Sequence, residues 1–197
     1  FCLSRGLGDV YKRQVIYSGG DDLFIVGPWY TLLELAYEIY DKFAKFSNNK
    51  KSLSAGYILS HPHTPSYILA YLARDAIDRS KKGGKSRICM FADEIEPIRW
   101  DTYREQLNLA IDLINAIEGN KLSRSALFAI LKEWYRYNRD VNSSIGALRY
   151  RIKYILSSAK RSNPDAKNVL EELDRKFSEN YIFLGLPLKL AELATRV

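Results

Sequence analysis

The sequence predicts an α+β fold, in which a small mixed domain is followed by a domain of helices only. In the first half of the chain, short apolar runs alternate with helical stripes in the order β-β-α-β-α-β. Beyond residue 95 the strand pattern ends, and apolar residues recur at helical spacing. The 197 residues are 47% hydrophobic and 27% charged, which is enough apolar material for a sizeable core.

The first fourteen residues, FCLSRGLGDVYKRQ, differ in character from the rest of the chain. The stretch SRGLGDVYKRQ resembles translated sequencing-adapter sequence, as seen at the broken ends of metagenomic reading frames. The chain opens on Phe1 rather than methionine, and no signal-peptide pattern comes after it. We therefore expect residues 1–14 to lie outside the fold, and the natural sequence to begin near Val15 as a C-terminal fragment cut inside a domain.

Two apolar runs, Val15–Tyr17 and Leu23–Val26, flank the sequence SGGDD at 18–22. β-Branched and aromatic residues around a Gly-Gly-Asp turn predict a hairpin. Glycines without a Cβ let a ligand approach the backbone, and the carboxylates of Asp21 and Asp22 are the oxygen ligands that Mg²⁺ or Mn²⁺ prefers. A solvated Gly-Asp turn gives the same spacing, so the residues alone leave a metal site and a plain turn open.

The other elements of the first domain come after the hairpin in order. Pro28 stands at the first turn of a helix, where its missing N–H costs nothing. Glycines and prolines then separate alternating apolar runs and amphipathic stretches. The predicted elements are a helix over 29–46, a strand over 53–60, a helix over 66–82 and a strand over 87–91.

The second half reads as helices, with breaks at Gly119-Asn120 and Asn163-Pro164 and an N-cap at Ser123. The predicted helices cover 100–117, 123–137, 140–160, 164–177 and 187–196. We place a domain boundary near residue 95, which gives a mixed domain over 15–94 and a helical domain over 95–197.

Net charge and cysteine usage restrict the partners and the location. The formal charge of +7 favours a polyanionic partner without naming one. The two cysteines, Cys2 and Cys89, make no disulfide framework, which favours a cytoplasmic location. No apolar run is long enough to span a bilayer, so we expect no membrane partner.

The motif SGGDD on a hairpin between apolar strands resembles the palm domain of the nucleotide-cyclase and GGDEF superfamily. The stretch ARDAIDRSKKGGKSRICMF at 73–91 is similar to the next helix, loop and strand of that superfamily. Asp22 replaces the glutamate of GGDEF, which is typical of the GGDD branch, the large Csm-type subunits of type III CRISPR effector complexes. The resemblance covers Val15–Val197 and implies a truncated ferredoxin-like palm followed by an all-α helical bundle.

This resemblance implies a chemistry as well as a fold. Such subunits bind ATP at the palm and, with target RNA bound, join ATP into cyclic oligoadenylates in antiviral defence. Carried over, Asp21 and Asp22 are the catalytic and metal-holding residues for Mg²⁺ or Mn²⁺. The implied nucleotide-binding residues are Ser18, Gly19, Gly20, Lys81 and Lys85. The implied partners are other CRISPR complex subunits, guide and target RNA held through the complex, and ATP.

The resemblance also implies missing parts. The earlier palm strand with its carboxylate, the first palm-like domain and the N-terminal HD nuclease domain do not precede Val15 in this sequence. We therefore expect an unpaired edge on the hairpin and no activity from the fragment alone.

Two other functions stay open at this point. A GGDEF-type diguanylate cyclase would use GTP, although Asp22 and the long helical tail argue against it. A palm that has lost catalysis would serve only as a scaffold or RNA-binding subunit. The segment 134–162 mixes aromatic and basic residues, which suits either an RNA backbone or amphipathic helices that surround a core.

Overall fold

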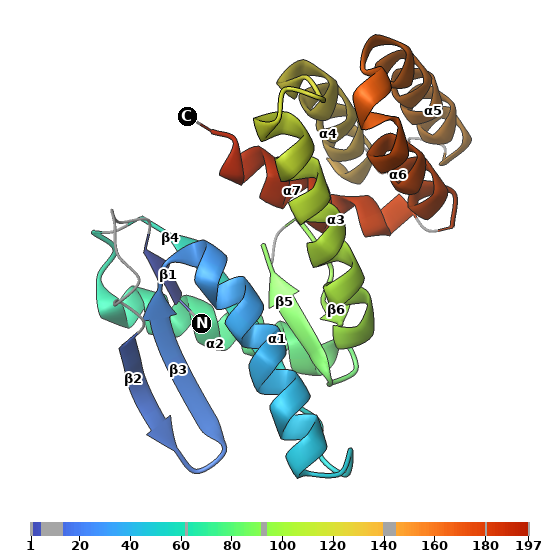
Figure 1. The fold of residues 1–197 in the computed structure, drawn as a ribbon. Coiled ribbons are helices and arrows are strands. Elements are labelled where there is room, and N and C mark those ends of the chain that lie inside the picture. Colours follow the sequence, from blue (N-terminus) through green and yellow to red (C-terminus); the bar gives the residue numbers. More distant parts are fainter. Residues whose placement is uncertain are drawn as a thin grey trace. The chain divides into compact units, whose positions relative to one another are not determined.

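The structure, a computed structural model, describes residues 2–4, 14–61, 63–91, 94–139, 145–179 and 181–196. The chain divides into two compact units, residues 1–103 and 104–197. The first unit contains a sheet with helices, and the elements described in the second unit are helical (Figure 1). The protein is therefore a mixed α+β protein, and the ferredoxin-like arrangement of the palm and the bundle form of the tail stay predictions.

The first unit is organised around one six-stranded sheet with the order β2-β3-β1-β4-β5-β6. The strands β1, β3, β4 and β5 are parallel to one another, while β2 and β6 are antiparallel to their neighbours. The strands are β1 (Cys2–Ser4), β2 (Gln14–Gly19), β3 (Asp22–Gly27), β4 (Ala55–Ser60), β5 (Arg87–Met90) and β6 (Ile98–Arg99). The two-residue strand β6 was not predicted, because so short a run carries no periodic signal.

The strand β1 lies between β3 and β4, with Cys2 opposite both Val26 and Ile58. The expectation that residues 1–14 lie outside the fold is therefore wrong for Cys2–Ser4. The expected unpaired edge of the hairpin is not that of β3, which pairs with β1, but that of β2. Pairing in a ladder uses backbone N–H and C=O groups, so it asks little of the side chains. The adapter origin of this segment stays a prediction, and residues 5–13 lie outside the described part of the chain.

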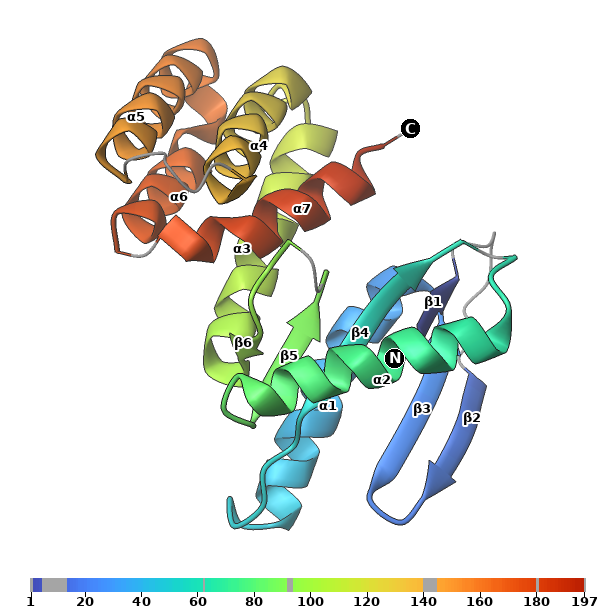
Figure 2. The ribbon, with the colours of Figure 1, turned by 180° about the vertical axis from the view of Figure 1, so that it is seen from behind.

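Two helices, α1 (Trp29–Phe46) and α2 (Ser66–Lys82), connect the parallel strands and cover opposite faces of the sheet. In Figure 1 α1 lies in front of the sheet, and in Figure 2, seen from behind, α2 lies in front of it. On the α1 side the Tyr57 hydroxyl donates to the Trp29 carbonyl at 3.0 Å. A Cβ added to Gly56, the preceding residue of β4, would lie 2.8 Å from the Ala73 carbonyl oxygen of α2. The alternation of Gly56 and Tyr57 thus seats one helix on each face.

The start of α3 (Trp100–Glu118) belongs to the first unit, beyond the boundary predicted near residue 95. The Trp100 ring stacks on Tyr40 of α1 at 4.8 Å between centroids, and its Nε1–H donates to the Leu53 carbonyl at 2.8 Å. The Tyr103 hydroxyl donates to the Leu33 carbonyl of α1 at 2.9 Å. Trp100 and Tyr103 are 1% and 0% exposed, so the division between the units falls just after them.

The second unit contains the remainder of α3 and four further helices, which differ from the predicted ones by a few residues at their ends. The Ala126 N–H donates to the Ser123 hydroxyl at 3.4 Å, which confirms the predicted N-cap. Asp140, the predicted start of the third helix, lies outside the described residues. The elements are α4 (Arg124–Arg139), α5 (Ile145–Ser162), α6 (Lys167–Glu179) and α7 (Gly185–Ala194), with 3₁₀ turns at Pro164–Ala166 and Tyr181–Leu184.

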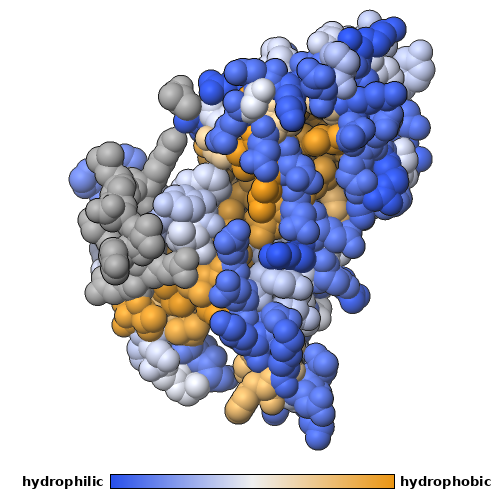
Figure 3. Space-filling model, in the orientation of Figure 1, coloured by the Kyte–Doolittle hydropathy of each residue, from blue (hydrophilic) through white to orange (hydrophobic). Residues whose placement is uncertain are grey.

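The β2–β3 hairpin keeps apolar side chains at the surface. Val15, Ile16 and Tyr17 of β2 are each more than half exposed, and Leu23 of β3 is 39% exposed. Figure 3 shows an orange, hydrophobic area over this part of the sheet. Among the described strands β2 pairs with β3 alone, so its outer edge offers both unpaired backbone groups and apolar surface.

We expect Gly56→Ala to destabilise the first unit by about 1–3 kcal/mol, because the added methyl group meets backbone atoms of α2 that cannot move away independently. Urea unfolding measures the change. Gly146→Ala is the matched control, since nothing lies within 4 Å of its added Cβ and alanine suits a helix better than glycine. Equal stability of the two variants would contradict the close contact between β4 and α2.

The buried phenol of Tyr57 predicts a loss of stability in alkali. Burial raises the pKa of Tyr57 well above its usual value of 10.0, and the nearby Tyr103 adds to the rise. The folded protein thus holds this proton more tightly than the unfolded chain, so the free energy of unfolding falls as the pH rises above about 10. Tyr57→Phe should cost about 1 kcal/mol at neutral pH and reduce this alkaline fall. Tyr67→Phe, at a tyrosine that is 73% exposed, is the control in urea unfolding between neutral and alkaline pH.

Candidate active site at the hairpin tip

The turn of the hairpin consists of Gly20 and Asp21, with Gly19 paired to Asp22 across the strand ends. Gly20 has a φ of +60°, whereas Asp21 does not have a positive φ. A left-handed residue at the first central position alone is the pattern of a type II′ turn, which glycine fits without strain. The sequence GGD is therefore what this two-residue connection requires locally, and the turn presents Asp21 at its tip.

Both aspartates are exposed and uncommitted. The side chains of Asp21 and Asp22 make no hydrogen bond or ion pair with any described residue. By contrast, Asp41 and Asp75 are each paired with a cation one helical turn away, Lys45 and Arg79. An added Cβ at Gly20 would meet nothing within 4 Å, so the space over the turn is open. The acids are thus free to bind a group that comes from solvent.

The remaining predicted residues of the turn lie beside the acids. Ser18 is exposed and pairs with Leu23 across the hairpin. Gly19 is half-buried because the Tyr17 ring folds over it, and an added Cβ would lie 2.6 Å from the Tyr17 hydroxyl. One side of Gly19 is therefore covered by an aromatic ring, and the open side of the turn is that of Gly20.

Lys81 and Lys85 lie at the end of α2 and in the loop before β5, and both are exposed. Because β3 and β5 run in the same direction, the hairpin tip and the start of β5 lie at the same edge of the sheet, namely the one where the parallel strands begin. This is the lower edge in Figures 1 and 2. Lys85 has a left-handed φ of 55°, and Ser86 after it has 48°. These are sparsely populated conformations for residues with a Cβ.

The structure brings these lysines to the same edge as the aspartates but not into contact with them. The strands β1 and β4 lie between β3 and β5. At about 4.8 Å a strand, the axes of β3 and β5 are about 14 Å apart. A single phosphate cannot bridge that span, whereas an extended nucleotide chain can. If both groups contact one ligand, the lysines bind it at a point distant from the acids.

The donor set at the tip fits a hard divalent cation only in part. Two carboxylates supply the oxygen ligands that Mg²⁺ uses, and Mg²⁺ usually keeps several waters as its other ligands. Within the described part of the chain, no group of three or more His, Cys, Asp and Glu residues is placed to hold a metal. The tip therefore suits a cation that binds together with a phosphate group.

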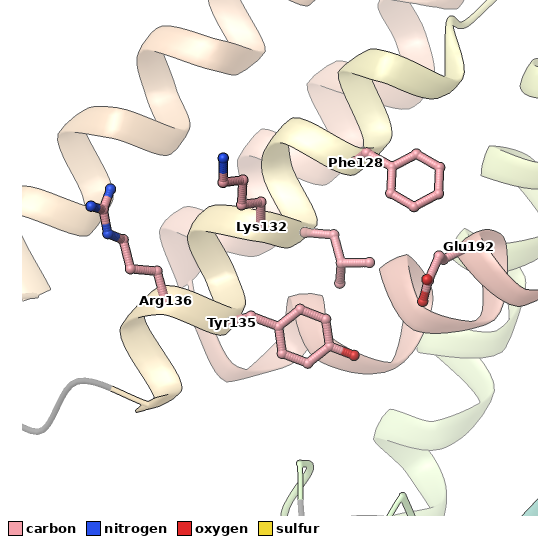
Figure 4. Close-up of a pocket in the computed structure, with 6 residues that line it drawn as sticks. Phe128, Lys132, Tyr135, Arg136 and Glu192 are labelled. Carbon is pink, nitrogen blue, oxygen red and sulfur yellow. The ribbon is translucent and has the colours of Figure 1, made fainter.

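Apart from the hairpin tip, a hollow of about 410 Å³ lies in the helical unit, between α4 and α7. It is lined by Phe128, Leu131, Lys132, Tyr135, Arg136 and Glu192 (Figure 4). Of these, Tyr135 and Arg136 belong to the segment 134–162 that the sequence indicated, and the other four were not singled out. Glu192 is 5% exposed and its Oε2 accepts no hydrogen bond, although Lys189 Nζ lies 3.7 Å away. The sequence signal for this hollow is Glu192, the lone acid in the apolar stretch LPLKLAELA. Helical periodicity alone does not tell whether such an acid is buried or exposed.

Comparison with known families finds a match within the first unit. Residues 5–89 match the family model of Cas10/Cmr2, second palm domain. The match includes the hairpin with its acids, α2 and most of β5, and it begins ten residues before Val15, within the segment expected to lie outside the fold.

Curated Cas10/Csm1 relatives extend the similarity past the palm. All three carry the name CRISPR system single-strand-specific deoxyribonuclease Cas10/Csm1, subtype III-A. That of Streptococcus thermophilus is 22% identical over 187 residues, which is 93% of this chain and 24% of the relative. That of Thermococcus onnurineus is 36% identical over 74 residues, 38% of this chain and 10% of the relative. That of Mycobacterium tuberculosis is 34% identical over 91 residues, which is 46% of this chain and 11% of the relative. The chain thus spans about a quarter of these relatives' length at most.

Two solved structures share the fold. The Csm1-Csm4 cassette in complex with cA4 matches 93% of this chain and 27% of the matched chain, with a TM-score of 0.69 and 23% identity. A Csm1-Csm4 cassette in complex with pppApApA matches 92% of this chain and 27% of the matched chain, with a TM-score of 0.67 and 24% identity. The similarity extends over both units of the chain. No described helix has the length and apolarity needed to cross a bilayer.

The geometry of the tip predicts a measurable cation affinity. We expect Asp21→Asn with Asp22→Asn to weaken Mn²⁺ binding about tenfold or more, because the two carboxylates are the oxygen ligands of the tip. The signal of free Mn²⁺ in electron paramagnetic resonance measures this. Asp41→Asn with Asp75→Asn removes the same charge from two paired acids and serves as the control. Equal affinities of the two double variants would show that the tip is not the cation site.

Proposed function

We propose that this chain carries the nucleotidyl-transfer site of a type III CRISPR effector subunit, which joins ATP into cyclic oligoadenylate when target RNA is bound. The observation that carries the proposal is the pair of exposed, uncommitted aspartates on an open type II′ turn, within residues that match the family model of Cas10/Cmr2, second palm domain. Asp21 and Asp22 would hold Mg²⁺ or Mn²⁺. The cation supplies neutralisation of the charge that develops on the phosphates during transfer.

The residues around the acids have distinct roles in this proposal. Gly20 leaves the turn open on one side, so that a triphosphate can come close to the backbone. Ser18 and Gly19 line the adjoining strand. Lys81 and Lys85, on the same edge of the sheet, balance negative charge on the part of the nucleotide that extends away from the acids.

The choice of ATP over GTP is supported by the adenine content of the ligands in similar structures. The Csm1-Csm4 cassette was solved with cA4 and with pppApApA. The pairing of Csm1 with Csm4 in that cassette supports a second CRISPR subunit as a partner of the complete protein. We therefore propose an ATP-using subunit of a cytoplasmic complex that also holds guide and target RNA.

The deciding experiment uses the complete type III complex whose large subunit contains this sequence. We expect Asp21→Asn with Asp22→Asn to lower the rate of oligoadenylate formation from ATP at least a hundredfold, since phosphoryl-transfer chemistry depends on the cation at the phosphates. Lys81→Gln with Lys85→Gln should instead raise the ATP concentration at half-maximal rate about tenfold. Target RNA binding by the complex is the control and should not change in either variant.

Two results would replace the proposal with another function. Undiminished oligoadenylate formation in the aspartate variant, with the complex intact, would leave the unit as a scaffold. Competition by GTP in place of ATP, with a cyclic dinucleotide as the product, would assign a diguanylate cyclase. Chromatographic separation of the labelled products distinguishes these outcomes.

A further inference from the structure

The helix α5 presents an outward stripe of tyrosines and cations. Tyr150 and Tyr154 are 78% and 66% exposed, whereas Ile152 and Leu156 on the other face are fully buried. At about 100° a residue, the two tyrosines and four other exposed side chains fall within one arc of about 140° around the helix. The outer stripe of α5 consists of Arg149, Tyr150, Lys153, Tyr154, Ser157 and Arg161.

The cations of α5 divide into two groups. The helix contains no acidic residue. Arg151 Nη1 lies 3.5 Å from Glu133 of α4, and Lys160 Nζ lies 2.7 Å from Asp174 of α6, so the cations that face neighbouring helices are paired. In the part of the chain that the structure describes, the three cations of the outer stripe make no ion pair. Those three are Arg149, Lys153 and Arg161.

An amphipathic helix around a core explains the paired cations but not the outer stripe. Two large aromatic residues one helical turn apart leave most of their surface exposed instead of burying it within the chain. Unpaired cations beside them repel one another without a compensating partner. In both ribbon views α5 lies at the outside of the helical unit, with α4 and α6 beside it (Figures 1 and 2). The stripe is therefore open to a large ligand.

From this arrangement we infer that the outer stripe of α5 binds single-stranded nucleic acid. Tyrosine faces are platforms for unpaired bases, and cations between them follow the phosphate backbone. The two rings are about 6 Å apart along the helix axis, since four residues rise about 1.5 Å each. The phosphates of the strand meet Arg149, Lys153 and Arg161 on the same arc. A duplex does not fit this site, because its bases are already stacked on one another.

The test measures binding of the whole chain to a fluorescein-labelled oligonucleotide of about 12 nucleotides by fluorescence anisotropy. We expect Tyr150→Ala with Tyr154→Ala to weaken binding about tenfold or more, because both stacking platforms are lost. Arg149→Gln, Lys153→Gln and Arg161→Gln together should reduce the slope of log affinity against log salt by about 2, at about 0.7 for each phosphate contact. Alanine and glutamine are good helix formers, and circular dichroism verifies that α5 is retained.

The chain offers matched controls for both changes. Tyr67 and Tyr71 of α2 are each 73% exposed and also four residues apart, but Asp75 and Asp78 come after them on that helix. Tyr67→Ala with Tyr71→Ala should leave the affinity unchanged. Lys42→Gln, Lys45→Gln and Lys167→Gln remove the same charge from exposed cations that are each paired with an acid, and the salt slope should stay the same.

Separate arms with RNA, with DNA of the same sequence and with the duplex identify the ligand. Tighter binding of either single strand than of the duplex supports the inference, and the tighter of the two single strands shows whether the ligand is RNA or DNA. No binding at low salt, or equal losses in the α5 variants and their controls, would overturn it. If polyglutamate displaces the oligonucleotide and the tyrosine variant keeps its affinity, the inference is overturned, and the ligand of the stripe is an acidic protein surface instead. The inference does not depend on the proposed catalysis, because no residue of the outer stripe of α5 belongs to the hairpin tip.

Discussion

The common direction of β3, β4 and β5 is the constraint on which the first unit depends. Parallel strands need a crossover that returns the chain to the starting edge, and α1 and α2 supply the two crossovers. The hairpin tip before β3 and the loop before β5 are thereby fixed at one edge of the sheet. This arrangement holds only while both helices remain in place, with α2 packed against Gly56 and α1 in contact with Tyr57, Trp100 and Tyr103.

Local sequence signals predicted most of the elements, because each is visible within a few residues. The GGD turn, the apolar stripe of α1 and the Ser123 cap are examples. Long-range pairing was not visible. Nothing near Trp100 in the sequence indicates that its ring stacks on Tyr40 or that its indole N–H bonds to Leu53, so the boundary was placed too early. The place of Cys2–Ser4 in the sheet was missed for another reason, since a ladder is satisfied by backbone groups that every residue carries.

At the candidate sites, the residue types indicated which chemistry was possible. Only the fold showed which residues of one type are free to bind a ligand and which are already paired within the chain. Asp21 and Asp41 are indistinguishable as carboxylates, yet one is uncommitted at an open turn and the other is bonded to Lys45. The cations of α5 divide in the same way, into those paired with neighbouring helices and those that are not. Helical periodicity does not show which residues on other helices a side chain contacts. The sequence alone therefore could not decide whether the segment 134–162 binds an RNA backbone or forms amphipathic helices around a core.

The backbone at Lys85 sets opposing pressures on that position. A left-handed φ of 55° is where glycine costs the fold least, and Gly84 immediately before it shows that the loop already uses glycine. The proposed contact with a nucleotide asks for a lysine at this position, whereas the backbone conformation favours glycine. Stability and the proposed binding therefore place opposite demands on one residue.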